Sequence, residues 1–263
     1  IPWPANYLSL FRFQSLVSSA GEEFVDLRCT IGDVPIAYVE YGKAAAYAAL
    51  PFGLVLASFL VWCMCGRCCV QKEKRNAMMT GTITLLLYLV YPSITGKALG
   101  IWKCRTVPGV GSIFVVDPET LCTDELHQIV TYGLALPMVL GYVVGLPVLA
   151  RYLLYKFRAK LDEPNTRARF GLLYEGFRRE AFLHETWVIL RKVLIIVVGT
   201  FFSEKLQVLF ALGIVGVLLT HTVMARPFEE ENLTRLETML LCCCFLTLWV
   251  GGIFVVYPEC GSS

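Results

Sequence analysis

The sequence predicts an all-α membrane protein, a bundle of about six transmembrane helices with an amphipathic segment on the outer side. Of its 263 residues, 56% are hydrophobic and 17% are charged, whereas soluble domains carry about 25% charged residues. Five stretches lack Asp, Glu, Lys and Arg over about twenty positions, enough for a helix to span a hydrocarbon core of about 30 Å. Helices are expected because a backbone in lipid must satisfy its own hydrogen bonds. The five stretches are 44–66, 76–96, 126–150, 206–225 and 238–258.

A sixth apolar stretch, which reaches its outer end near Phe202, carries the basic pair Arg191-Lys192 inside it. With six helices, the loops after the first, third and fifth helices hold fourteen Lys and Arg, and the opposite side holds seven. Basic loops stay in the cytoplasm. We therefore expect an integral membrane protein with its N-terminal segment, the 97–128 loop and its C-terminus outside. A plasma membrane or another surface membrane is the expected location.

Three regions follow one another along the chain. Residues 1–43 form an extracellular or interfacial pre-membrane segment, in which apolar residues recur at roughly helical spacing over 7–25. This stretch is too polar to span, and it predicts an amphipathic helix at the outer interface; a soluble helix packed on the outer loops is the alternative. Residues 44–258 form the six-helix transmembrane domain, and 259–263 form a tail.

The third and fourth helices have distinctive features. The third carries Pro137 and Pro147, with Gly141-x-x-x-Gly145 between them, which predicts a kinked helix with a close-packing notch. Only Ser203-Glu204-Lys205 separates the fourth helix from the fifth, which predicts a tight antiparallel hairpin. The intervening segment 151–186 is basic and interleaves aromatic residues with arginines. This pattern predicts a segment that lies under the membrane, with its basic groups reaching lipid phosphates.

The cysteines divide by side of the membrane. Cys104 and Cys122 bracket a stretch of the outer loop 97–128, and we predict that a disulfide closes it as a hairpin-like cap, which would stabilise the fold by roughly 3 kcal/mol. Four others gather beside a basic run at the cytoplasmic end of the first helix. Reversible lipidation is the expectation for these juxtamembrane thiols, with unmodified thiols and a zinc site as the alternatives. They are Cys63, Cys65, Cys68 and Cys69.

The basic pair Arg191-Lys192 admits two interpretations. Eleven residues separate Arg191 from Phe202, which places it roughly 16 Å from the outer end of the helix, near the bilayer middle. A charge there costs at least about 2.5–3.5 kcal/mol unless it is paired or reaches the interface. Either the helix sits shallow and the pair marks the cytoplasmic interface, or the pair joins an intramembrane ion-pair network with Glu185 or Glu237.

No motif for catalysis rises above chance, so we expect no enzyme, no cofactor, no metal and no nucleic-acid partner. The lipid bilayer is the expected partner, together with an upstream ectodomain or spans of the same protein. The few polar side chains that could line a path or act as a switch are Thr80, Thr84, Thr220 and His221. His221 is read either as an interfacial hydrogen-bonding group or as a pH sensor.

Several motifs follow one another in a distinctive order. They are Pro2-Trp3-Pro4, Tyr91-Pro92-Ser93, the Cys104 to Cys122 loop, Gly145-Leu146-Pro147, Arg169 to Phe177, Trp187, Leu190 to Leu194 and His221 to Phe228. This order resembles a known family, the C-terminal membrane domain of large protist and algal surface proteins with cysteine-rich, ephrin-receptor-like ectodomains. That domain is described as similar to transient receptor potential and polycystin-type channels. The resemblance implies an upstream ectodomain and at least one earlier span.

Three functions are compatible with this pattern. The first is a cation-channel-like or mechanosensory membrane domain, a homo-oligomer if it conducts. The second is a non-conducting anchor and signalling module for a large adhesive ectodomain. The third is a transporter-like bundle, because helices interrupted by Gly and Pro are common in transporters. Channels of the resembling superfamily place a pore helix between their last two spans, whereas here about twelve residues on the cytoplasmic side join them.

Overall fold

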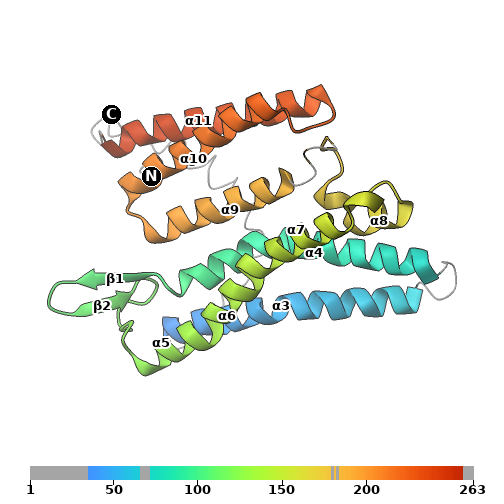
Figure 1. Ribbon diagram of the computed structural model, residues 1–263. Coiled ribbons are helices and arrows are strands. Elements are labelled where there is room, and N and C mark those ends of the chain that lie inside the picture. The colour runs from blue at the N-terminus through green and yellow to red at the C-terminus, as the bar shows by residue number, and fades with distance from the viewer. Residues whose placement is uncertain (1–34, 66–71, 179–180, 182–183, 257–263) are drawn as a thin grey trace.

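The computed structural model describes residues 35–65, 72–178, 181 and 184–256, which form a bundle of long helices (Figure 1). Five helical segments are long and apolar enough to cross a membrane, which confirms the helical membrane class. The expected amphipathic helix over 7–25 and the tail 259–263 lie outside the described residues. The five segments are Ile36–Met64, Glu73–Gly100, Glu125–Lys160, Lys205–Ala225 and Glu231–Phe254.

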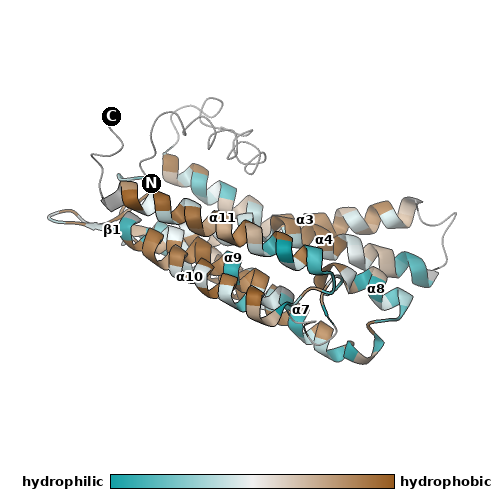
Figure 2. Cartoon of the chain, turned by 90° about the horizontal axis from the view of Figure 1, so that it is seen from above, coloured by the Kyte–Doolittle hydropathy of each residue, from teal (hydrophilic) through white to brown (hydrophobic). Residues whose placement is uncertain are grey.

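The bundle has two distinct ends, for which we use two names. The hairpin end carries the strands β1 (Cys104–Val107) and β2 (Gly111–Phe114), and the basic end carries residues 157–178. Hydrophobic residues predominate along the long helices, and hydrophilic residues gather around α8 (Pro164–Phe170) at the basic end (Figure 2).

The first two long helices are α3 (Ile36–Cys65) and α4 (Lys72–Gly100), which pack side by side. The boundary expected between 1–43 and 44–258 falls inside α3, which begins at Ile36. The helix continues past the apolar stretch because its charges are paired: Glu40 lies 2.8 Å from Lys43 Nζ and 3.7 Å from Lys97 Nζ of α4.

The loop 97–128 contains a β-hairpin, which departs from the all-α prediction. Cys104 pairs with Phe114 across the antiparallel strands β1 and β2. The buried carboxylate of Asp117 then accepts hydrogen bonds from the backbone N–H of Ala37, at 3.1 Å, and from the Thr120 hydroxyl, also at 3.1 Å. An anion is stabilised at a helix N-terminus, so Asp117 fastens the hairpin to the start of α3.

The third long helix is continuous but irregular. It comprises α5 (Glu125–Val130), η1 (Thr131–Ala135), α6 (Leu136–Met138), η2 (Val139–Val144) and α7 (Gly145–Lys156), in which η1 and η2 are π-helical. Each π segment ends within three residues of Pro137 or Pro147, because a proline removes a helical hydrogen bond. Pro147 lacks the N–H that would bond the carbonyl of Val143, and the Tyr91 hydroxyl of α4 donates to that carbonyl at 2.8 Å.

The basic end folds compactly after α7. It consists of η3 (Arg158–Lys160), α8 and η4 (Gly171–Leu173), whose Phe170 and Leu173 pack on Leu154 of α7. Gly81 of α4 allows this packing, because a Cβ there would lie 2.3 Å from the carbonyl oxygen of Ala168. Residues 157–178 therefore form a folded unit docked on α4.

The last three helices are α9 (His184–Phe201), α10 (Glu204–Ala225) and α11 (Glu231–Val256). α10 and α11 pack closely along their length, and α9 lies between them and the α4–α7 group (Figure 1). α9 has 18 residues and is not among the five apolar segments, because its sequence contains three charged residues, Glu185, Arg191 and Lys192.

Candidate functional site

The basic pair on α9 contacts two different helices. Arg191 Nη1 lies 2.7 Å from Glu237 Oε1 of α11, and both side chains are about three-quarters buried, at 22% and 24% exposure. Arg191 is seven residues from the start of α9 and ten from its end, so it lies well inside the bundle. Glu237 directly precedes the apolar stretch of α11, and the arginine therefore reaches a carboxylate nearer the basic end.

Lys192 points in another direction. Its Nζ donates to the Tyr88 hydroxyl of α4 at 2.8 Å and lies 4.0 Å from the centroid of that ring. Successive residues project about 100° apart on a helix, so neighbouring cations fasten α9 to α11 on one side and to α4 on the other. Sequence patterns do not predict the contact with Tyr88, because the two residues are 104 positions apart along the chain. The side chain of Glu185, the other expected carboxylate, lies outside the described residues.

An imidazole and aromatic cluster lies nearer the basic end. The rings of His184 (α9) and His221 (α10) stack with their centroids 5.6 Å apart and their planes 11° from parallel. Trp187 packs on His221, and Phe177 and Phe228 pack on His184. The sequence places the two histidines on separate helices and does not predict this pairing.

His184 is buried and lies outside the five apolar segments. Burial, and next the positive charge that His221 would carry, lower the pKa of His184 from 6.5 to about 4; Glu237 opposes this and Arg191 adds to it. The imidazole of His184 is therefore neutral at physiological pH.

Backbone hydrogen bonds lie beside the aromatic cluster and join two of the segments that form it. Phe177 and Phe228 form an isolated antiparallel bridge, in which Arg178 N–H donates to Pro227 O at 2.8 Å and Glu229 N–H donates to Gly176 O at 2.9 Å. The segment after η4 is thereby tied to the connector between α10 and α11. The cluster and the bridge hold the segment after η4 against α9, α10 and the α10–α11 connector at the basic end.

The expected path-lining groups are not brought together. The hydroxyls of Thr80, Thr84 and Thr220 each donate to the carbonyl four residues earlier in their own helix, at 2.9–3.0 Å. Thr80 and Thr84 belong to α4, whereas Thr220 and His221 line a groove along α10. Within the described residues, these four side chains belong to two separate surfaces.

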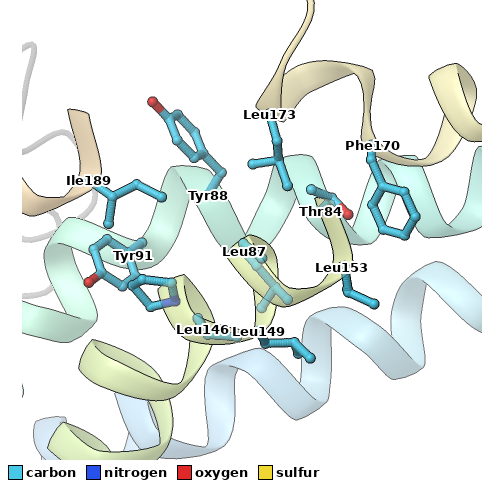
Figure 3. A pocket seen from close by; sticks show the side chains of 12 residues that line it. Thr84, Leu87, Tyr88, Tyr91, Leu146, Leu149, Leu153, Phe170, Leu173 and Ile189 are labelled. Carbon is cyan, nitrogen blue, oxygen red and sulfur yellow. The ribbon is translucent and has the colours of Figure 1, made fainter. Parts of the chain in front are cut away.

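An apolar pocket opens among α4, α7, η4 and α9, and Figure 3 shows its lining. Its volume is about 120 Å³. The residues around it include Leu87 and Tyr91 of α4, Leu153 of α7, Phe170 of α8 and Ile189 of α9. Neither composition nor periodicity predicts this pocket, because it forms where four segments far apart in sequence meet.

The predicted disulfide is present. Cys104 and Cys122 are bonded, with their Cα atoms 6.3 Å apart. His127 lies beside it, with Nε2 3.9 Å from Cys104 Sγ and Nδ1 sharing a 2.7 Å hydrogen bond with the Tyr41 hydroxyl. The hairpin, the start of α3 and the start of the third helix are therefore joined at one point.

The expected lipidation sites are only partly described. Cys63 of α3 is a free, half-buried thiol. The side chain of Cys65 and the whole of Cys68 and Cys69 lie outside the described residues. Lipidation of these four cysteines stays a prediction.

Comparison with known proteins gives one similarity. The chain is 24% identical over 194 residues to cysteine repeat modular protein A of Toxoplasma gondii. The match covers 68% of this chain and only 6% of that protein, so the chain spans a small fraction of its relative's length. No family model matches the chain. No solved structure matches it either, so the likeness to transient receptor potential and polycystin channels stays a prediction.

Proposed function

We propose that this chain is the membrane anchor and signalling module of a much larger modular surface protein. The similarity to cysteine repeat modular protein A carries the proposal, because it covers two-thirds of this chain and 6% of the relative. A helical membrane region that occupies so small a part of a long protein suits an anchoring role. The rest of such a protein would supply the recognition.

The connection between the last two helices supports an anchor over a channel. α10 ends at Ala225 and α11 begins at Glu231, so five residues join them. Three of these, Pro227, Phe228 and Glu229, are engaged by the segment after η4. A re-entrant pore helix does not fit in a connector of this length.

The signalling part of the proposal rests on α9. Arg191 and Lys192 fasten this helix to α11 and α4 through one charged hydrogen bond each. The helices α3 and α4 adjoin the β-hairpin at the hairpin end of the bundle. A shift of these two helices would be passed through α9 to α10 and α11 by these contacts. Packed helices with discrete contacts can transmit such shifts.

The deciding experiment measures both anchoring and conduction with the full-length protein. In cells, the protein should resist alkaline extraction and display its upstream portion at the surface. Purified and reconstituted in planar bilayers, the folded protein should stay electrically silent under voltage, membrane stretch and lowered pH. Reproducible cation currents would contradict the proposal and favour the channel hypothesis, and substrate-dependent uptake into vesicles would favour the transporter hypothesis.

A further inference from the structure

We propose that the apolar pocket among α4, α7, η4 and α9 binds an acyl chain of an anionic phospholipid, whose phosphate lies at the basic end of the bundle. The inference concerns a ligand of the bundle and is independent of whether the chain anchors, conducts or transports. It rests on the chemistry of the pocket interior, on the orientation of the pocket and on the charge at one end of it.

The interior offers hydrocarbon surface. Three hydroxyls border the pocket, and each is engaged elsewhere: Thr84 donates to Thr80 O, Tyr91 donates to Val143 O, and Tyr88 accepts from Lys192. The other lining groups are apolar. An apolar cavity of roughly 150 Å³ stays dry and takes up hydrocarbon, so a pocket of about 120 Å³ among membrane helices suits a length of acyl chain.

The pocket runs along the bundle. Tyr91 and Ile189 lie at one end of it, and Phe170 and Leu153 lie at the other, next to the basic end (Figure 3). Leu149 of α7 lines the pocket and is 50% exposed, so an acyl chain in the bilayer can reach the interior from the side. A chain lying along this direction has its headgroup beside α8.

The charge at that end is positive. Residues 157–178 contain five Lys and Arg and three Asp and Glu, a net charge of +2. Arg169 directly precedes the lining residue Phe170, and its Nε is buried without a hydrogen-bond partner among the described residues. A guanidinium forms strong hydrogen bonds with phosphate oxygens, and basic residues at a membrane surface favour anionic lipids. The headgroup of an anionic phospholipid would supply the missing partner.

The test is photocrosslinking in nanodiscs that contain the full chain. Phosphatidylglycerol and phosphatidylcholine analogues with a photoreactive group in one acyl chain are compared at equal mole fraction, and the labelled peptides are mapped by mass spectrometry. We expect the anionic analogue to label the pocket peptides about fivefold more strongly, the discrimination expected of one basic contact. Equal labelling by both analogues would overturn the anionic assignment.

Two pairs of variants separate the pocket from its surroundings. Ala150→Phe fills the pocket and should abolish its labelling, whereas Val148→Phe, at an exposed position outside the lining of the same helix, should not. Arg169→Gln should equalise the two analogues, whereas Arg158→Gln should preserve the preference. If Ala150→Phe does not fold, the smaller Ala150→Leu should give partial loss. Unchanged labelling in a folded Ala150 variant would overturn the proposed site.

Discussion

Arg191 and Glu237 form a charged pair that sits between helices rather than at their surface. Removing one partner of a buried pair leaves the other charge uncompensated. The sequence left two interpretations of the basic pair open, a position at the cytoplasmic interface or an intramembrane ion-pair network. It could not choose between Glu185 and Glu237, because that choice depends on which helices are neighbours.

We expect Glu237→Gln to destabilise the folded protein by as much as about 3–5 kcal/mol, the usual range for breaking a buried ion pair. Glu231→Gln on the same helix is the matched control: its partner Arg235 lies 3.6 Å away and both side chains are more than 60% exposed. An exposed i, i+4 pair contributes about 0.3–0.5 kcal/mol. Unfolding experiments in detergent measure the free energy of unfolding of both variants. A similar decrease in the two variants would contradict a special role for Glu237.

His184 predicts a pH dependence with a definite sign. Its folded pKa is about 4, below the 6.5 of the unfolded chain, so the folded state resists protonation. The contribution of His184 to the free energy of unfolding is therefore complete above about pH 6.5. It is lost as the pH drops toward 4, by roughly 3 kcal/mol at about 1.4 kcal/mol per pKa unit. His184→Phe should remove this part of the pH dependence. Parallel unfolding curves of the two proteins between pH 7 and 4 would contradict it.

At the scale of elements, the lengths of the apolar stretches were enough to locate the long helices. Charge-free runs of about twenty residues leave few alternatives in lipid, and the Cys104 and Cys122 spacing indicated the closed outer loop. A hairpin-like cap was predicted there, but its pairing as two β-strands and the two π segments of the third helix were not. Both depend on local hydrogen bonding around glycines and prolines, such as Pro147, rather than on hydrophobic periodicity.

The contacts that define the candidate sites were also beyond sequence reasoning. The His184–His221 stack, the Lys192–Tyr88 bond and the apolar pocket each join segments far apart along the chain. Periodicity tells which face of a helix is apolar and says nothing about which neighbour it meets. These contacts therefore become visible only once the arrangement of the helices in space is known.

The docking of α8 on α4 should depend on the absence of a side chain at Gly81. Gly81→Ala would place a Cβ 2.3 Å from the backbone oxygen of Ala168, so α8 must move away. We expect a loss of about 1–3 kcal/mol, typical of overpacking, and faster proteolysis within residues 157–178. Gly96→Ala, with open space around the same helix, should be neutral or stabilising. Unchanged proteolysis in Gly81→Ala would contradict the close contact.

At the scale of the whole molecule, the bridge between Phe177 and Phe228 constrains how often the chain crosses the membrane. These residues lie on the same side because their backbones pair. We therefore expect the segment between them, α9 and α10, to cross the membrane an even number of times. Since α10 is long and apolar enough to span, we expect α9 to cross as well, despite its basic pair, which would give six crossings rather than five.

The crossing number can be measured with single cysteines and a membrane-impermeant maleimide. We expect Val110→Cys, at the exposed tip of the hairpin, to react in intact cells, and Glu230→Cys, in the α10–α11 connector, to react only after permeabilisation. The expected orientation follows from the fourteen-to-seven division of Lys and Arg. The signal of the unsubstituted protein is subtracted, because free cysteines such as Cys243 are exposed. Reaction of both sites from outside would mean that α9 does not cross, and a reversed pattern would invert the orientation while preserving six crossings.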